Sequence, residues 1–199
     1  MGAELTAVLD VAAVRILDVD TELMLRFQAG EAACFDELVA RYRKPLLAFL
    51  YRMVRDLGAS EDLLQDAFLR VYNHRVRYQP SAHFRTWVYQ IAHHLALNHI
   101  RDHRRERMGD SLDQPVSACD DAPARELADS RPTVEQALLQ QSIADHRRDR
   151  IRAAIAALPE RQRAAVLLHK YQGLNYLGIG GILGLSESAT KSLLFRAYE

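Results

Sequence analysis

Apolar residues recur every three or four positions along two neighbouring stretches of this sequence, residues 61–74 and residues 84–107. In the second stretch the recurring residues are Phe84, Trp87, Val88, Ile91, Leu95 and Ile100. This spacing places side chains on one face of an α-helix. No part of the sequence shows the strict alternation of apolar and polar residues that is typical of a half-buried β-strand. We therefore expect an all-α protein with a helical domain over residues 20–107.

The helix predicted over residues 84–107 ends in a cluster of arginines. Four of them lie within seven residues: Arg101, Arg104, Arg105 and Arg107. Because neutralisation of phosphates supplies much of a protein's affinity for nucleic acid, this cluster is typical of a nucleic-acid-binding helix. Basic residues in a last helical turn also interact favourably with the helix dipole, and a charged run is usually only a solvated surface. The stretch alone leaves both interpretations open.

The charges balance over the whole chain but are unevenly distributed along it. The sequence has 26 Lys and Arg residues and 26 Asp and Glu residues, so its formal net charge is zero. Residues 98–107 and 147–163 are basic, whereas residues 108–131 contain six acidic residues and two arginines. This distribution favours two basic modules joined by an acidic connector over one electrically neutral domain.

Residues 108–132 have the composition of a flexible linker. They show no helical periodicity and are rich in Asp, Ser, Ala and Pro, so they offer too little apolar surface to offset the entropy of ordering. Helical periodicity resumes after Thr133, which begins a sequence of capping-box form. We therefore predict a second helical domain over residues 133–199.

The end of the chain has the pattern of a helix-turn-helix. A short helix is predicted over residues 175–183, Gly184 and Leu185 form a tight turn, and Ser186 caps a second helix. The second helix of such a motif reads the major groove of DNA. A plain helical hairpin gives a similar pattern, so this motif alone does not establish DNA binding.

Helix boundaries in the first domain are predicted from breaking and capping residues. A long helix is expected to begin near Glu31 and to continue past Pro45. Residues 58–60 (Gly-Ala-Ser) are expected to end it, with Ser60 as the N-cap of the next helix. Ser81 is expected to cap the helix that follows it in the same way.

The sequence gives little support to other classes of protein. No apolar run approaches the ~20 residues needed to cross a bilayer, and no secretory signal is seen, so a cytoplasmic protein is expected. Cys34 and Cys119 offer neither a disulfide framework nor a zinc pattern. His99 and His103 are four residues apart, but no third ligand is spaced nearby, so no metal site is expected. No phosphate-binding loop or nucleophile motif is present, so we expect neither cofactor nor catalytic residues.

Taken together, these stretches resemble a bacterial RNA polymerase sigma factor of the extracytoplasmic-function (group IV) type. The first matching segments are DTELMLRFQAGEAACFDELVARYRKPLLAFLYRMV (20–54), EDLLQDAFLRVY (61–72) and FRTWVYQIAHHLALNHIRDHRR (84–105). A further match is LPERQRAAVLLHKYQGLNYLGIGGILGLSESATKSLLFRA (158–197). The resemblance implies two small helical domains, sigma-2-like (20–107) and sigma-4-like (133–199), joined by an acidic flexible linker (108–132).

The resemblance also implies three sets of functional residues. The set implied to bind core RNA polymerase is Asp62, Gln65 and Asp66, which share one helix face. The set implied to melt and read the −10 promoter element is His94, Asn98, Arg101, Arg104 and Arg105. The set implied to read the −35 element is Ser188, Thr190, Lys191, Ser192 and Arg196. Arg85 and Trp87 are expected to pack and brace their helix, and the implied partners are core polymerase, promoter DNA and an anti-sigma factor.

The C-terminal motif departs from the family pattern. Leu177-Gly178 stands where the family usually has an acidic pair, and Gly180-Gly181 follows within the same short helix. Each glycine inside a helix costs about 0.5–1 kcal/mol relative to alanine. The segment 186–199 has no net charge. These departures predict a weakened or incomplete −35 reader.

Two other functions remain open at this point. A degenerate sigma-like protein would bind polymerase through Asp62, Gln65 and Asp66 without supporting transcription from promoters. A helix-turn-helix regulator would bind duplex DNA by itself and would not act as a polymerase subunit, although such a protein has no need of the arginine cluster at residues 101–107.

Overall fold

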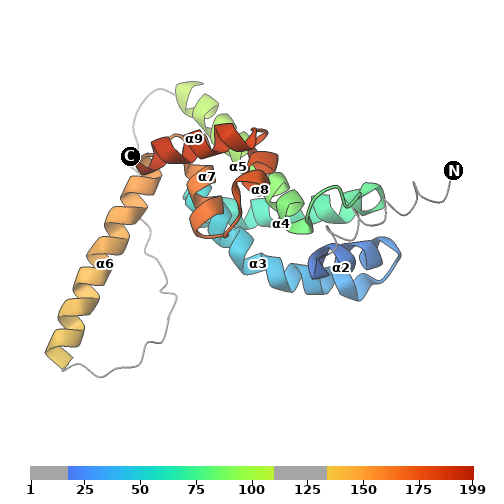
Figure 1. Ribbon diagram of the computed structural model, residues 1–199, viewed down its shortest axis with the longest axis horizontal. Helices are drawn as coiled ribbons and strands as arrows, with labels where there is room; N and C mark the ends of the chain where they lie inside the picture. The colour runs from blue at the N-terminus through green and yellow to red at the C-terminus, as the bar shows by residue number, and fades with distance from the viewer. Residues whose placement is uncertain (1–17, 110–133) are drawn as a thin grey trace. The chain divides into compact units, whose positions relative to one another are not determined.

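The computed structural model describes residues 18–109 and 134–199, with side chains described for residues 18–105 and 146–199. These residues form α-helices and one 3-10 turn and contain no β-strand, which confirms the predicted all-α fold (Figure 1). The elements are α2 (Val19–Gln28), α3 (Ala32–Val54), α4 (Leu57–His74), η1 (Arg75–Arg77), α5 (Phe84–Gly109), α6 (Val134–Ala157), α7 (Glu160–Lys170), α8 (Tyr176–Leu183) and α9 (Glu187–Tyr198). Of the predicted linker, residues 108–132, only the first two lie within the described residues, and they extend α5.

The chain divides into two compact units. Among the described residues, the larger unit contains residues 18–102 together with 158–199, and the smaller contains residues 103–109 and 134–157. Among the described residues, the larger unit therefore holds α2, α3, α4, most of α5, and α7 to α9, whereas α6 belongs to the smaller unit.

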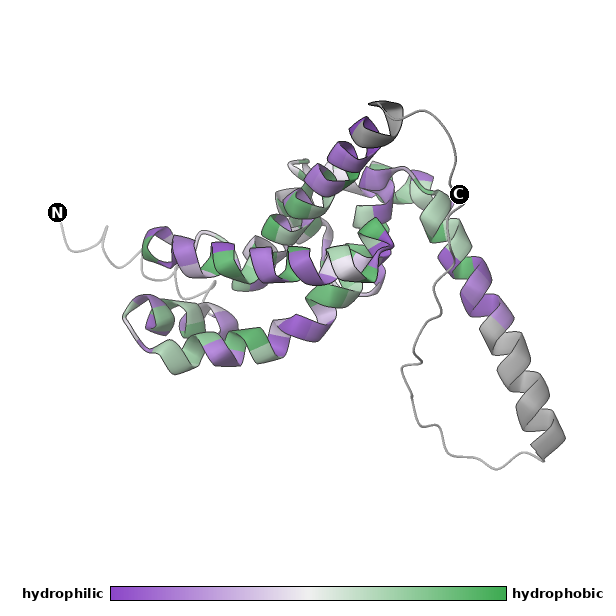
Figure 2. Ribbon diagram, turned by 180° about the vertical axis from the view of Figure 1, so that it is seen from behind, coloured by the Kyte–Doolittle hydropathy of each residue, from purple (hydrophilic) through white to green (hydrophobic). Residues whose placement is uncertain are grey.

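Helix α3 is the central element of the larger unit because α2, α4 and α7 all pack against it. Buried residues recur every three or four positions along α3, and hydrophobic and hydrophilic bands alternate along its ribbon (Figure 2). Its largest buried side chains are Leu38, Tyr42, Leu46, Phe49, Leu50 and Met53. Each such side chain contributes roughly 1.5–3 kcal/mol when fully buried. Pro45 lies inside α3 without ending it, as predicted.

Helix α4 begins four residues earlier than predicted, at Leu57. Arg55 ends α3 in the left-handed conformation, with φ of 63°, so the chain needs no Gly-Ala-Ser break. Asp56 is the N-cap, and its Oδ1 accepts a hydrogen bond of 2.7 Å from the N–H of Ala59. The prediction that Ser60 caps α4 is wrong, because Ser60 is fully buried within the helix and its hydroxyl donates to the Asp56 carbonyl.

Helix α5 begins where the apolar spacing predicted, at Phe84, but the predicted cap Ser81 is wrong. Ser81 is exposed and lies three residues before the start of the helix. The N–H of Phe84 donates a 3.1 Å hydrogen bond to the Thr21 hydroxyl, which belongs to α2. This first amide has no partner inside its own helix, so a side chain 63 residues earlier in the chain supplies one.

Helix α5 buries a histidine along with its apolar face. The side chain of His93 is 3% exposed, and neither ring nitrogen has a hydrogen-bond partner among the described residues. Burial, together with the charges of His94 and Arg161, lowers the pKa of His93 to about 4. His93 is therefore neutral in the folded protein at neutral pH.

Helices α7, α8 and α9 form the predicted helix-turn-helix unit and pack against one another. Asn175 caps α8 by accepting from the N–H of Gly178 at 2.8 Å, and Ser186 caps α9 by accepting from Ala189 at 3.2 Å. Gly184 makes the turn between α8 and α9 with φ of 67°, a conformation that favours glycine.

Gly180 is required by the close approach of α8 to the turn that follows it. A Cβ atom on Gly180 would lie 2.6 Å from the carbonyl oxygen of Leu185, which is too close for any side chain. On Gly181 a Cβ atom would meet only Thr86 Cγ2, at an ordinary 3.6 Å. Gly180 is thus needed for the close approach of α8 to the following turn, although a glycine inside a helix is locally unfavourable.

Gly180→Ala is expected to lower the free energy of unfolding by about 1–3 kcal/mol, because the new methyl group overlaps backbone that cannot easily move. Gly181→Ala is the matched control and should be neutral or stabilising by up to about 1 kcal/mol. Urea denaturation followed by circular dichroism measures both. Equal effects of the two substitutions would contradict this account of Gly180.

Stability should depend on the protonation of His93. The ring has a pKa of about 4 when folded and about 6.5 when unfolded, so the stabilising effect is complete above pH 6.5 and is lost as the pH falls towards 4. The full loss corresponds to roughly 3 kcal/mol. Denaturation curves between pH 7.5 and 4.5 should show a smaller decline for His93→Leu than for wild type. His74→Gln, at an exposed position that does not affect the His93 pKa, should retain the wild-type decline.

Candidate polymerase- and DNA-binding surfaces

Helix α4 presents a polar face to solvent over its first half. Asp62, Gln65 and Asp66 are all exposed, while Leu63 and Ala67 on the other side of the helix are buried. Spacings of three and four residues put the three polar side chains on one face. The structure therefore brings the predicted polymerase-binding residues together, with two carboxylates and an amide available to meet basic side chains of a partner.

Helix α5 presents a second polar face. His94, Asn98, Arg101 and Arg105 are exposed and follow one another at spacings of four, three and four residues, which makes one stripe along the helix. Arg104 is exposed as well, but it lies to one side of this stripe and interacts with another residue. Four of the five predicted −10 residues thus form a continuous surface, which we call the α5 stripe.

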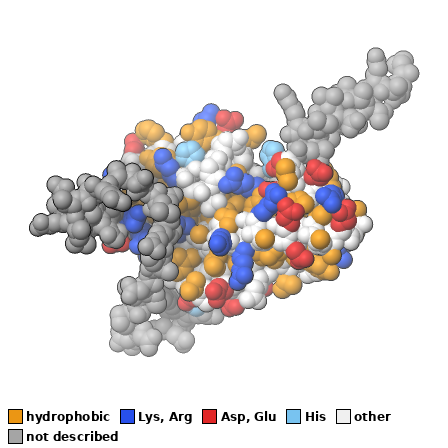
Figure 3. All heavy atoms as spheres, turned by 90° about the horizontal axis from the view of Figure 1, so that it is seen from below, with side chains coloured by type: hydrophobic (Ala, Val, Ile, Leu, Met, Phe, Trp, Pro, Cys, Tyr) orange, Lys and Arg blue, Asp and Glu red, His pale blue; other side chains and the backbone are white. Residues whose placement is uncertain are grey.

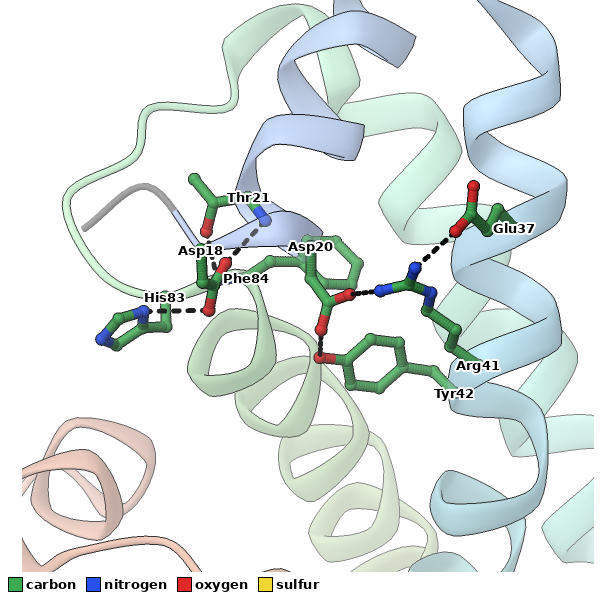
Figure 4. Close-up of polar contacts among 8 residues, drawn as sticks. All are labelled: Asp18, Asp20, Thr21, Glu37, Arg41, Tyr42, His83 and Phe84. Carbon is green, nitrogen blue, oxygen red and sulfur yellow. Dashed lines mark hydrogen bonds and ion pairs between the residues drawn. The ribbon is translucent and has the colours of Figure 1, made fainter. Parts of the chain in front are cut away.

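The position of α5 is fixed at its first turn by a group of polar residues from α2 (Figure 4). Asp18 caps α2 by accepting from the N–H of Thr21 at 2.7 Å, and its other oxygen lies 3.0 Å from Nδ1 of His83. The Thr21 hydroxyl in turn accepts from the N–H of Phe84. Partial burial opposes ionisation of Asp18, but its hydrogen bonds with Thr21 and the nearby His83 hold the pKa of this carboxyl below its ordinary value.

A second polar group ties α2 to α3 beside the first (Figure 4). Asp20 accepts from Arg41 Nη1 at 2.8 Å and from the Tyr42 hydroxyl at 2.5 Å. Burial and the neighbouring Asp20 carboxylate raise the pKa of Tyr42, which keeps its hydroxyl protonated as a donor. The Tyr42 ring also packs edge-on against Phe84, with centroids 5.2 Å apart. Both polar groups therefore contact residues that pack against Phe84, the first residue of α5.

Trp87 lies in the first turns of α5 and packs against neighbouring aromatic rings, as predicted. It is partly buried, and its ring lies 4.9 Å from Tyr78 and 5.9 Å from Phe84, measured between centroids. Sequence reasoning missed the residues that anchor this end of the helix, namely Asp18, Thr21 and His83. Only the apolar spacing of Phe84 and Trp87 signalled that the region would be packed.

Helix α9 presents four of its five predicted DNA-reading residues to solvent: Ser188, Lys191, Ser192 and Arg196. Thr190 differs: the prediction that it lies on the DNA-facing side is wrong. Its side chain is fully buried, its hydroxyl donates to the Ser186 carbonyl at 2.9 Å, and it lies against Gly180 of α8. Thr190 lies about half a helical turn away from the exposed face and packs α9 against α8.

The exposed face of α9 has little free positive charge. Lys191 Nζ lies 2.8 Å from the Glu187 carboxylate one turn earlier, and both side chains are about half exposed. Phe195 lies at the centre of this face and is 65% exposed, a feature that the sequence analysis did not identify. Its spacing of seven from Ser188 and three from Ser192 is the signal that could have revealed it.

One face of the molecule carries mixed charge. On the face shown in Figure 3, basic and acidic side chains are interspersed with hydrophobic ones, in keeping with the zero net charge. Within the described ranges, no group of three or more His, Cys, Asp or Glu residues could hold a metal ion. A search of the same residues finds no helix that is both long and apolar enough to span a membrane.

Comparison with protein families gives two matches in chain order. Residues 38–106 match the model of Sigma-70 region 2, and residues 148–199 match that of Sigma-70 region 4. The two matches together cover more than half of the 199 residues. The first contains α4 and the α5 stripe, and the second contains the helix-turn-helix.

Comparison with known proteins gives relatives of similar length. The chain is 32% identical to the RNA polymerase sigma factor CarQ of Myxococcus xanthus over 176 residues, which is 88% of this chain and 91% of CarQ. It is 29% identical to the ECF RNA polymerase sigma factor SigM of Bacillus subtilis over 162 residues (81% of this chain, 89% of SigM). It is 28% identical to the ECF sigma-E factor of Escherichia coli over 182 residues (90% of this chain, 91% of sigma-E).

A solved structure supports the fold. CnrH, determined in complex with the cytosolic domain of CnrY, superposes with a TM-score of 0.61 at 22% identity, covering 91% of this chain and 93% of that one. With two sigma-70 regions in order and a 32% identical relative matched over nearly its whole length, this chain belongs to the sigma-70 family and is an RNA polymerase sigma factor of the ECF type.

Proposed function

We propose that this sigma factor directs transcription initiation through three separate surfaces: the polar face of α4 for core RNA polymerase, the α5 stripe for the −10 element, and the exposed face of α9 for the −35 element. The observation that carries the proposal is the α5 stripe, in which His94, Asn98, Arg101 and Arg105 form one exposed surface on a helix anchored at its first turn. The degenerate and regulator-only alternatives are not favoured, because the relatives match over both domains.

The α5 stripe is suited to opened promoter DNA. Extruding a base from the duplex costs a few kcal/mol, which phosphate contacts and stacking can offset. Arg101 and Arg105 are exposed cations for backbone phosphates, whereas His94 and Asn98 offer ring and amide groups that can hydrogen-bond a base edge. The position of these residues along one face allows a single strand to follow the helix.

The α4 face is suited to a basic protein surface. Carboxylates at positions 62 and 66 can form charge-assisted hydrogen bonds with Arg or Lys side chains of a partner helix. In the sigma family this surface meets the clamp helices of the largest polymerase subunit, and we propose the same partner here.

The α9 face is proposed to contact the −35 element through Ser188, Ser192 and Arg196. Lys191 contributes less positive charge than its position suggests, because Glu187 pairs with it. We therefore propose that −35 recognition depends more on hydrogen bonds and on Phe195 than on phosphate attraction, and that it is weak.

Three further proposals follow from the family. The chain has no catalytic activity of its own, because the polymerase performs the chemistry. It acts in the cytoplasm, where polymerase and promoters are located. An anti-sigma factor is its proposed regulator, because the RpoE of Bartonella quintana, similar in fold (TM-score 0.59, 18% identity), was solved in complex with the anti-sigma factor NepR.

Substitution of the α4 face should abolish polymerase-dependent transcription. We expect Asp62→Ala/Gln65→Ala to reduce transcripts by at least about tenfold in vitro with core polymerase, because charge-assisted contacts to the clamp are lost. Asp36→Ala, at an exposed acid of α3, is the matched control and should behave as wild type. If the double variant is as active as the wild type, the polymerase does not bind this face of α4. If the wild type supports no transcription from a promoter library, the proposed function is refuted.

Arg101→Ala should weaken promoter opening in a salt-dependent way. Each phosphate contact contributes about 0.7–0.9 to the slope of log affinity against log salt concentration, so the slope should fall by about that amount. Open-complex formation measured between 50 and 300 mM salt provides the test. Arg43→Ala, at an exposed arginine of α3, should leave the slope unchanged. An unaltered slope for Arg101→Ala would place this residue away from the DNA backbone.

A further inference from the structure

The first two turns of α9 carry an exposed ion pair. Glu187 is the first residue of the helix, and Lys191 follows one turn later. Lys191 Nζ lies 2.8 Å from Glu187 Oε1, and the side chains of the two residues are 55% and 51% exposed. An exposed pair of this kind contributes little to stability. Its importance therefore lies mainly in the groups that it presents to a partner.

Aromatic side chains hold Lys191 from its other side. Lys191 Nζ lies 5.5 Å from the centre of the Tyr176 ring, within the range of a cation–π interaction. The Tyr176 ring stacks on His169, with centroids 5.5 Å apart, and His169 Nδ1 lies 2.9 Å from the Tyr198 hydroxyl. The hydrogen bond with Glu187 raises the pKa of Lys191, which keeps its ammonium charged. Because both side chains are already held in place, they lose less conformational entropy when a partner binds.

The ion pair belongs to the part of α9 that is closest to the bases in the proposed function. The second helix of a helix-turn-helix contacts base edges with its N-terminal residues. The exposed residues of the first two turns are Glu187, Ser188, Lys191 and Ser192. The ion pair thus lies beside the two serines that are proposed to read the −35 element.

The ion pair offers a hydrogen-bond acceptor next to a donor, without net charge. A lone carboxylate would be repelled by the phosphates of DNA, but Lys191 balances the charge of Glu187. In the major groove a C·G base pair presents the opposite arrangement, because the cytosine amino group donates and guanine O6 and N7 accept. The amino nitrogen and O6 are about 2.9 Å apart, the usual length of an N–H···O bond. This separation matches the 2.8 Å between the two charged groups of the protein.

An A·T base pair fits the ion pair less well. The adenine amino group lies beside N7, an acceptor that would face the Glu187 carboxylate, and the thymine methyl group lies beside O4, where it would meet the Lys191 ammonium. Cytosine has only a C–H group beside its amino group. Guanine offers N7 as a second acceptor for the three N–H donors of a lysine. Both halves of the ion pair therefore favour C·G.

We propose that Glu187 and Lys191 together read one C·G base pair of the −35 element: Glu187 accepts from the cytosine amino group, and Lys191 donates to guanine O6 and N7. This inference rests on the proposed function, since it requires α9 to lie in the major groove at the −35 element. Tyr176 is a positioning residue, because it holds Lys191 beside Glu187 without touching the base. A helix with little free positive charge thereby gains sequence specificity from hydrogen bonds.

Selection from a promoter library randomised at the −35 element, using polymerase loaded with the full-length protein, tests the base contact. The wild type should prefer C·G at one position, and any other base pair there should lower affinity by about five- to a hundredfold. Glu187→Ala and Lys191→Met should each abolish this preference while preferences at the other positions remain. Glu199→Ala, at an exposed acid just after α9, is the matched control and should keep the wild-type preference.

The salt dependence of binding separates base reading from simple restraint of Lys191. If Glu187 only kept Lys191 away from phosphates, Glu187→Ala would strengthen binding to all −35 sequences alike, raise the salt slope by about 0.9 and leave the C·G preference in place. That result would overturn the proposal. For the positioning role, Tyr176→Ala should weaken the C·G preference, whereas Tyr176→Phe, which keeps the ring, should retain it. Equal preferences of these two variants would remove Tyr176 from the contact.

A second selection, with the isolated full-length protein and random duplexes at low salt, separates this proposal from the proposed function. If the isolated protein shows a C·G preference that depends on Glu187 but polymerase loaded with it does not initiate transcription, the proposed function fails and the base contact stands. If the loaded polymerase initiates transcription but neither selection shows a C·G preference that Glu187→Ala abolishes, the base contact is refuted and the proposed function stands.

Discussion

The hydrogen bond from the N–H of Phe84 to the Thr21 hydroxyl is the interaction on which the arrangement of the sigma-2-like part depends. It caps α5 from outside its own helix and fixes the place where this helix begins, and Asp18 and His83 hold the two sides of the contact together. A helix that starts at a defined residue presents defined faces along its length. The exposure of His94, Asn98 and Arg101 on one side therefore follows from packing at residues 83 and 84, about three to five helical turns away.

Helix α5 carries two surfaces with different physical character. One side is polar and exposed and ends in arginines, and we propose that it follows the opened strand. The other side buries Tyr89 and the neutral His93, and it receives Gln172 from the turn that follows α7. Because these sides are opposite, the residues proposed to bind DNA stay exposed while the other side of α5 is packed.

Local sequence patterns predicted much of the fold. The apolar spacing predicted α3, α4 and α5, and the turn at Gly184 with the cap Ser186 predicted the helix-turn-helix, because these signals depend only on residues within a turn or two. Ser60 and Ser81 were misassigned as caps for the same reason: a serine before a helix resembles a cap locally, while Asp56 and Thr21 supply the actual acceptors. Whether residues 108–132 form a linker stays a prediction, since nearly all of them lie outside the described residues.

The sequence by itself determined the helical class, the order of the two sigma regions, and the stripe of polar residues on α4 and α5, because helical periodicity and motif order are properties of neighbouring residues. Only the tertiary structure decided that Thr190 lies inside, that Gly180 is demanded by the Leu185 carbonyl, and that Gln172 is buried against Tyr89. These outcomes depend on which surfaces meet. Gln172 and Tyr89 are 83 positions apart in the sequence. Their contact is determined by burial and by the need of buried polar groups for hydrogen bonds, and local helix propensity does not predict it.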